Sequence, residues 1–316
     1  MRICTAKGYP GAVQIRFLPV GKDKQEEIME KYIIAVDMDG TLLNSENKIS
    51  ERNRNVLQRL IDDGHYVVPA TGRTRELIPQ EFSVLRGVKW GIVENGCVVW
   101  DYDKNEMIWR KTMPKGMVSK ILKDVEDSGA KVVEKNYAKG WIAEAYANGI
   151  AYSDADARDY VASVADKALL EKTFVDYFLS RHVYVKDFYH QKDILDQAEK
   201  INIYFDDMEN SRELREKWKD LDDVAVTTSI SGNAEFNAAG VDKGVGLAML
   251  RTKLGIDRMH VIAFGDNEND LEMLEAVGTG VAMANASPEL KALADAVCPS
   301  VAEDGIWQYC AAHGLI

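Results

Sequence analysis

The chain has 316 residues, of which 46% are hydrophobic and 28% charged, and its formal net charge is −12. This length accommodates two domains, and the acidic balance argues against nucleic acid or an anionic membrane as a partner, since both call for basic patches. No run approaches the roughly 20 apolar residues of a membrane span. The four cysteines form no CxxC pair, so we expect neither disulfides nor a zinc site, and a reducing cytoplasm as the compartment.

Residues 1–30 are predicted to be a poorly ordered extension. They combine Gly8, Pro10 and Gly11 with the charged run 22–30, and they lack the long apolar stretch of a signal peptide. A strong strand follows directly, and Met29 precedes it. We therefore expect Met29 to be the native start, with a real regulatory tail as the alternative. N-terminal sequencing of the native protein would decide between them.

From residue 31 the chain alternates short apolar segments with helical periodicity. Strands are predicted at 32–36, 66–70 and 91–93, and a helix runs between the first two, from Ser50 to Gly64. This rhythm predicts an α/β fold with a doubly wound, mostly parallel sheet. Ligands bind beyond the carboxyl ends of the strands in such sheets. Polar clusters stand at those ends, at 37–41, 71–73 and 94–96.

The middle third of the chain lacks this rhythm. A hairpin at 98–102 and 107–111 leads into a predicted helix from Pro114 to Gly129, strands near 131–134, 141–145 and 201–205, a helix at 208–219 and a strand at 224–228. We interpret residues 113–238 as an inserted α+β domain, and residues 31–112 and 239–316 as the core. The βα rhythm returns with a helix from Lys243 to Leu254, a strand at 260–264, a helix from Leu271 and strands at 280–283 and 296–298.

Two carboxylates end the first strand, at Asp37 and Asp39. Side chains two apart on a strand point the same way. Carboxylates held that close raise each other's pKa unless a cation intervenes. The pair therefore indicates a metal or a shared proton, although the stretch taken alone fits an ordinary acidic turn better.

Three further polar groups follow strands or open helices. Thr71 precedes a glycine, where a hydroxyl and backbone amides can hold phosphate, and Lys243 opens a helix against the helix dipole. Asp266 and Asp270 flank the start of another helix. Each has an ordinary explanation as a cap, a solvated lysine or an acidic first turn. Together they supply a carboxylate nucleophile, ligands for a hard cation and donors for phosphate, as phosphoryl transfer through an aspartate requires.

Four stretches resemble the motifs of the haloacid dehalogenase-like phosphatases: DMDGTL from residue 37, ATGR from residue 70, VDKG from residue 241 and GDNEND from residue 265. VAMANA at 281–286 and AEDG at 302–305 are similar to the C-terminal signatures of the Cof-type branch, which has a large α/β cap. The resemblance runs from about residue 31 to the C-terminus. It implies that the inserted domain is a cap that closes over the core and selects the leaving group.

The resemblance also implies a role for each matched residue. Asp37 would attack phosphorus, and Asp39 would protonate the leaving alcohol and then deprotonate water. Arg73 would hold its loop or reach substrate, a structural ion pair being the alternative. The implied Mg²⁺ ligands are Asp37, the carbonyl of Asp39, Asp266 and, in support, Asp270. The implied phosphate-binding groups are the amides of Met38 and Gly72 and the side chains of Thr71, Lys243 and Asn269.

The sequence thus predicts a Mg²⁺-dependent phosphatase for a small phosphorylated metabolite, either a sugar phosphate or a cofactor phosphate. An acid at position 39 favours phosphate esters over carbon–halogen or carbon–phosphorus bonds within this family. The alternatives are a phosphomutase of the same fold and a non-catalytic binding or regulatory member. Five polar cap residues are candidates for substrate contact on type alone, and each also fits an ordinary surface position: Tyr137, Lys139, His182, Tyr189 and His190.

Overall fold

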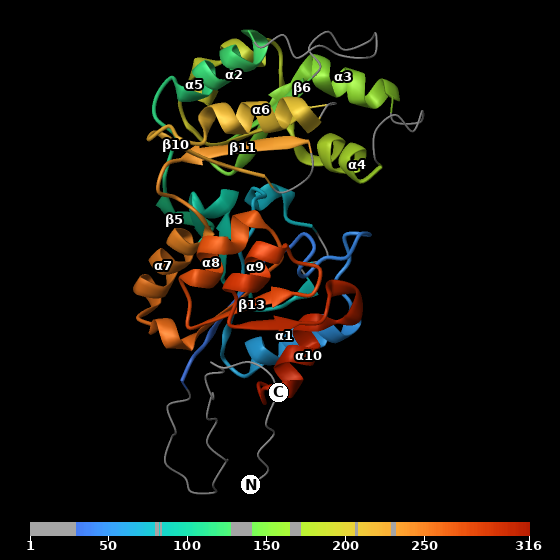
Figure 1. The fold of residues 1–316 in the computed structure, drawn as a ribbon, viewed down its shortest axis with the longest axis vertical. Helices are drawn as coiled ribbons and strands as arrows, with labels where there is room; N and C mark the ends of the chain where they lie inside the picture. The colour runs from blue at the N-terminus through green and yellow to red at the C-terminus, as the bar shows by residue number, and fades with distance from the viewer. Residues whose placement is uncertain are drawn as a thin grey trace, which may run out of the picture.

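A computed structural model describes residues 30–79, 82, 84–127, 141–164, 172–205, 208–228 and 232–316. Figure 1 shows two parts stacked along the long axis, the lower of which contains the C-terminus. The predicted extension, apart from Glu30, and the predicted strand at 131–134 lie outside the described residues. Among the described helices, none is long and apolar enough to cross a membrane.

The lower part, called the core below, is built on a five-stranded parallel sheet in the order β14-β13-β12-β1-β2. This order confirms the predicted doubly wound parallel sheet. Its strands are β1 (Ile33–Val36), β2 (Tyr66–Pro69), β12 (Val261–Gly265), β13 (Thr279–Met283) and β14 (Ala296–Cys298). Its helices are α1 (Glu51–Asp62), α7 (Lys243–Leu254), α8 (Leu271–Glu275), α9 (Pro288–Leu293) and α10 (Gly305–Ala312).

Strand β1 lies inside the sheet, between β12 and β2, and is buried on both faces, which explains its uninterrupted apolar sequence. Ile34 and Val36 pack into the cluster that contains residues of α1 and α10, whereas Ile33 and Ala35 pack against residues of α7 and α8. Successive strand residues point to opposite faces, so one short run supplies both hydrophobic layers. The polar residues that follow the strand therefore emerge from a rigid support.

The segment predicted at 91–93 pairs differently from expectation. Strand β3 (Trp90–Val93) forms an antiparallel sheet with β4 (Val98–Asp101) and β5 (Glu106–Arg110), and it adjoins the end of β2 through the parallel bridge between Ala70 and Ile92 and the hydrogen bond from the amide of Thr71 to the carbonyl of Ile92. The turn from β3 to β4 is the short 3-10 segment Glu94–Gly96. So short a connection permits only antiparallel pairing, because parallel neighbours need a long crossover.

The upper part, called the cap below, carries a six-stranded sheet in the order β10-β11-β9-β6-β7-β8. The strands and helices predicted for its described residues are present, whereas the strand predicted at 131–134 lies outside those residues and the domain limits at 113 and 238 stay a prediction. The strands are β6 (Trp141–Ala147), β7 (Ile150–Asp154), β8 (Val183–Val185), β9 (Ala198–Phe205), β10 (Val224–Thr227) and β11 (Asn233–Ala238). The helices are α2 (Met117–Asp127), α3 (Ala155–Val164), α4 (Lys172–Arg181), α5 (Lys192–Leu195) and α6 (Met208–Trp218).

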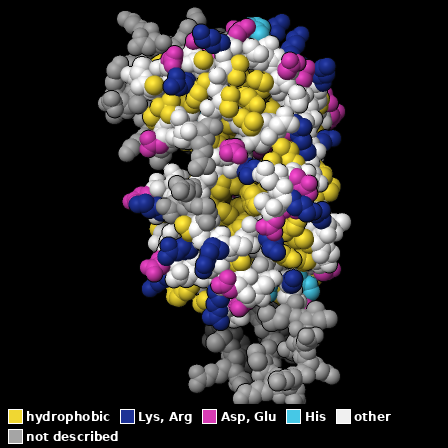
Figure 2. Space-filling view, turned by 180° about the vertical axis from the view of Figure 1, so that it is seen from behind, with side chains coloured by type: hydrophobic (Ala, Val, Ile, Leu, Met, Phe, Trp, Pro, Cys, Tyr) yellow, Lys and Arg dark blue, Asp and Glu magenta, His cyan; other side chains and the backbone are white. Residues whose placement is uncertain are grey.

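The two faces of the cap sheet differ in chemistry. Alternate apolar residues of β6, β9 and β11 pack against α2, α5 and α6. The intervening residues are mostly polar, and Figure 1 shows β11 between α6 and the core, so this second face is turned toward the core. Seen from behind, the surface is hollowed where cap and core meet (Figure 2). Five polar side chains of this face are no more than 3% exposed: Glu144, Lys200, Asn202, Glu235 and Asn237.

Candidate active site

Several predicted site residues follow the carboxyl ends of three neighbouring strands, β12, β1 and β2. Asp37 comes after β1, Thr71 two residues after β2, and Asp266 after β12, while Lys243 is the first residue of α7. The carboxyl ends of adjacent parallel strands share one edge of the sheet. The fold therefore brings these side chains together although more than 200 residues separate Asp37 from Lys243.

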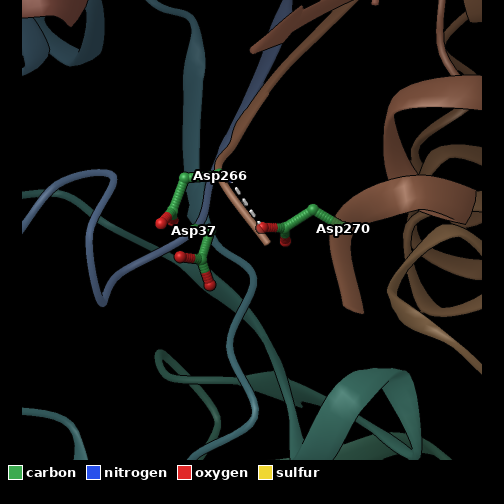
Figure 3. Close-up of side chains that lie close together, drawn as sticks. All are labelled: Asp37, Asp266 and Asp270. Atoms are coloured by element: carbon green, nitrogen blue, oxygen red, sulfur yellow. Dashed lines mark hydrogen bonds between the residues drawn. The ribbon is translucent and has the colours of Figure 1, made fainter. Parts of the chain in front are cut away.

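Asp37, Asp266 and Asp270 form a compact acidic cluster (Figure 3). One carboxylate oxygen from each lies within 4.8 Å of the others. Burial first, and then the neighbouring Asp270, raise the pKa of Asp37 well above its usual value and the pKa of Asp266 to about 6. A bound cation would offset the repulsion between these buried carboxylates, and a set of carboxylate oxygens suits a hard divalent ion. The cluster thus fits a metal site.

Lys243 is the cation that the structure already places among these acids. Its Nζ donates to Oδ1 of Asp37 at 2.6 Å and to Oδ1 of Asp270 at 2.7 Å, and its side chain is fully buried. Burial alone lowers the pKa of Lys243, but the carboxylates of Asp270 and Asp37 raise it above its usual value. The neutralisation of two buried acids explains a lysine at the unfavourable end of a helix. Asp242 caps that helix by accepting from the amide of Val245 at 2.8 Å.

Asp270 and Thr41 hold the acidic cluster in shape. Oδ2 of Asp270 accepts from the amides of Asp266 and Asn267 at 3.0 and 3.1 Å. The hydroxyl of Thr41 donates to Oδ1 of Asp266 at 2.7 Å. With one oxygen bound to Lys243 and the other to two amides, Asp270 is placed to orient the site rather than to contact a substrate.

The carboxylate of Asp39 lies apart from this cluster. Arg73 holds it through two hydrogen bonds, Nε to Oδ2 at 2.8 Å and Nη2 to Oδ1 at 2.7 Å. The side chain of Asp39 is 51% exposed, whereas that of Arg73 is 17% exposed and lies 5.4 Å from the ring centre of Tyr177 in the cap. Of the roles considered for Arg73, which were to hold its loop, to reach substrate or to form a structural ion pair, the structure shows an ion pair with Asp39. That pair orients the carboxylate expected to act as acid and base.

The other predicted phosphate-binding residues are buried beside the cluster. Thr71 is 1% exposed, and its hydroxyl oxygen accepts from the amide of Arg73 at 3.2 Å. Asn269, 7% exposed, donates to Oδ1 of Asn95 at 3.1 Å. A side chain on Gly72 would meet Oδ1 of Asn95 at 2.8 Å, so Gly72 and Asn269 both adjoin Asn95. Met38 is fully buried directly after Asp37. The phosphate-binding roles of these residues stay predictions.

Two cap residues that the sequence analysis missed reach this region. Lys200 on β9 donates to the carbonyl of Gly72 at 2.9 Å, and Glu235 on β11 accepts from Nδ2 of Asn95 at 2.7 Å. The available signal was the alternation of polar and apolar residues at 200–204 and 233–237. Such alternation marks a strand with one polar face, and here that face is buried against the core.

The cap residues proposed on type alone have other surroundings. Nε2 of His182 lies 3.0 Å from Oε1 of the buried Glu144. Tyr189 packs edge-on against Trp141, and His190 pairs with Asp187 on the surface. Tyr137 and Lys139 lie outside the described residues.

A family model of the haloacid dehalogenase-like hydrolases matches residues 34–309. The chain therefore belongs to this family, which confirms the resemblance seen in its motifs. Among its relatives, 5-amino-6-(5-phospho-D-ribitylamino)uracil phosphatase YcsE of Bacillus subtilis is 29% identical, over 89% of this chain and 95% of the relative. Phosphatase YwpJ of the same organism is 28% identical, over 87% of this chain and 96% of the relative.

A solved structure of a haloacid dehalogenase-like hydrolase from B. subtilis superposes with a TM-score of 0.73. It is 27% identical and covers 88% of this chain and 98% of its own. The family and its phosphatase members agree with the enzyme class predicted from the sequence, a phosphoric monoester hydrolase.

Proposed function

We propose that this protein hydrolyses small phosphomonoesters with the help of Mg²⁺ and through a phosphoryl group carried by Asp37. The observation that carries the proposal is the buried Asp37 carboxylate, bound to Lys243 and grouped with Asp266 and Asp270. A carboxylate between a cation and further acids is what a metal-assisted aspartate nucleophile needs.

The reaction consists of two displacements at phosphorus, the first by Asp37 and the second by water. In the first, an oxygen of Asp37 forms a bond to phosphorus while the bond to the leaving alcohol breaks, and Asp39 gives that alcohol a proton. In the second, Asp39 takes a proton from water, the water oxygen bonds to phosphorus, and Asp37 is released with inorganic phosphate. Acid–base help of this kind contributes about 10²–10⁴-fold.

The remaining groups would hold the metal ion and neutralise the negative charge of the phosphate. Asp37, Asp266 and the carbonyl of Asp39 would hold Mg²⁺, with Asp270 orienting them. The ion would supply charge neutralisation at the phosphoryl oxygens. Lys243 and Thr71, with nearby backbone amides, would take up the remaining phosphate charge from fixed positions, which is more effective than solvation by water.

The relatives suggest the first substrates to test. Three of them are named 5-amino-6-(5-phospho-D-ribitylamino)uracil phosphatases, at 29%, 27% and 28% identity. We propose that compound, together with sugar phosphates and cofactor phosphates, as the starting panel for assays of Mg²⁺-dependent phosphate release. An isomerised sugar phosphate without free phosphate would instead indicate a phosphomutase.

The test of the nucleophile is Asp37→Asn, which preserves shape but removes the negative charge. We expect phosphate release from p-nitrophenyl phosphate to fall to background while the circular dichroism spectrum stays that of the native protein. Asp62→Asn, at the exposed end of α1, is the matched control and is expected to retain full activity. Turnover near the wild-type rate in Asp37→Asn would refute the assignment.

A further inference from the structure

The loop 71–73 is held by one hydrogen bond at each of its three carbonyls. The carbonyl of Thr71 accepts from the amide of Asn95 at 3.1 Å, and that of Arg73 accepts from the amide of Glu94 at 2.9 Å. The carbonyl of Gly72, between them, accepts from Nζ of Lys200 at 2.9 Å. Two of the three donors thus belong to the core, and the third comes from the cap.

These bonds determine where the loop amides point. In a trans peptide the carbonyl and the following amide point in opposite directions, and no cis bond occurs among the described residues. The contact to the Thr71 carbonyl therefore turns the Gly72 amide away from Asn95. Likewise, the contact from Lys200 turns the Arg73 amide toward Oγ1 of Thr71, which accepts from it at 3.2 Å. An oxygen that accepts there keeps its own hydrogen free to donate to an anion.

A second contact joins the cap to the same region. Nζ of Lys200 lies 2.8 Å from Oε2 of Glu235, and that oxygen also accepts from Nδ2 of Asn95 at 2.7 Å. Oδ1 of Asn95 then accepts from Nδ2 of Asn269 at 3.1 Å. Lys200, Glu235 and Asn95 are each no more than 2% exposed. One buried ion pair of the cap is thereby connected both to the loop and to Asn269.

We propose that Lys200 is a positioning residue of the cap, which completes the phosphate-binding loop when cap and core are together. Through their hydrogen bonds, Glu235 and Asn95 also position the side chain of Asn269. This inference rests on the proposed function, because it takes loop 71–73 and Asn269 as phosphate-binding. Its consequence is that the phosphate-binding groups are fully positioned only when the cap is closed on the core. Closure of the cap over a substrate therefore also completes the site that acts on the phosphate.

The experiment compares Lys200→Met and the double variant Lys200→Met/Glu235→Gln with wild type. The double variant removes both charges of the pair, so it tests the inference even where the single variant, with Glu235 unpaired, folds poorly. Lys217→Met is the matched control, because Lys217 lies on the cap surface and is 60% exposed. Melting temperature and circular dichroism establish that each variant is folded.

Two readouts separate positioning from substrate contact. Binding of inorganic phosphate to the Mg²⁺-supplemented protein, measured by calorimetry, is expected to weaken about tenfold or more in both Lys200 variants and to stay unchanged in Lys217→Met. The value of kcat/KM is expected to fall by one common factor, about 10- to 100-fold, for p-nitrophenyl phosphate and for a polyol phosphate alike. Both substrates share only the phosphate.

Two outcomes would overturn the inference. Phosphate affinity equal to wild type in a folded double variant would show that Lys200 does not control the loop. A loss confined to the polyol phosphate would make Lys200 a leaving-group contact instead. Failure of the proposed function is distinguishable, since wild type would then release no phosphate from any ester, whereas failure of the inference alone leaves wild-type turnover intact.

Discussion

The acidic cluster depends on the absence of a side chain at Gly40. This residue has φ of +87°, a conformation that L side chains rarely adopt, and a Cβ built on it would lie 2.3 Å from Oδ2 of Asp266. Gly64, at the end of α1, has nearly the same φ of +92° but has nothing within 4 Å of a Cβ position. The variants Gly40→Ala and Gly64→Ala therefore share the backbone strain and differ only in the contact with Asp266.

The magnitudes follow from these contacts. The left-handed conformation costs roughly 1–2 kcal/mol for an alanine at either position. In Gly40→Ala the Asp266 carboxylate must also retreat by about 0.7 Å to bring the contact from 2.3 Å to the 3.0 Å below which real Cβ atoms essentially never pack. That movement disturbs the hydrogen bond from Thr41 at 2.7 Å. Displacement of a carboxylate and its partner typically costs about 10–100-fold in metal affinity.

Calorimetric titration with Mg²⁺ and urea unfolding in chelator measure the two effects separately. We expect both variants to unfold at lower urea concentration than wild type, and only Gly40→Ala to lose about 10–100-fold in Mg²⁺ affinity. The rate of phosphate release at limiting Mg²⁺ should fall in parallel with that affinity. Equal Mg²⁺ affinity in the two variants would refute the placement of Asp266 as a metal ligand next to Gly40.

Two further predictions concern buried charge. Lys243→Met leaves Asp37 and Asp270 without their cation, so urea unfolding in chelator at pH 7 should show a loss of about 3–5 kcal/mol, against less than about 1 kcal/mol for the exposed Lys253→Met. A similar small loss in both would contradict a buried ion network. Burial, and next Glu199, raise the pKa of Glu94 in the folded state. The native protein then binds more protons than the unfolded chain. The free energy of unfolding therefore falls as pH rises above the usual pKa of a glutamate side chain. Glu94→Gln should therefore raise the urea midpoint at pH 8 and change it less at pH 5; an equal shift at both would exclude titration as the cause.

The sequence revealed the core of the site because its chemistry follows strand ends. Asp37 and Asp266 stand directly after buried apolar strands, and Lys243 opens a helix at a capped start. Strand and helix boundaries of that kind are visible in hydrophobic periodicity, and parallel pairing then places them at one edge. The four family motifs, which occur in their usual order along the chain, supported the same set of residues. The hydrogen-bond partners within the cluster, such as Asp270 for Lys243, could be identified only from the structure.

The sequence could not reveal which residues the cap contributes. Lys200 contacts Gly72 across 128 positions, and Glu235 contacts Asn95 across 140. The alternation at 200–204 predicts a strand with a polar face, but a polar face is ordinarily exposed to solvent. Only the packing of the cap on the core turns that face into a buried one. The antiparallel pairing of β3 with β4 was not predicted for a related reason, because strand order is decided by connections and not by composition.

The charges of the described site also indicate what is needed to balance it. Three carboxylates and one ammonium group, all in mutual contact or within 4.8 Å, leave two negative charges when all are ionised. The neighbouring pairs Arg73–Asp39 and Lys200–Glu235 are each neutral and change nothing in this balance. Burial makes such an excess costly, and the raised pKa values of Asp37 and Asp266 show that protons would offset it in the absence of another cation. One divalent ion removes the excess without those protons and leaves Asp37 ionised, the form in which a carboxylate is nucleophilic. A monovalent ion would leave one negative charge to repel the phosphate dianion.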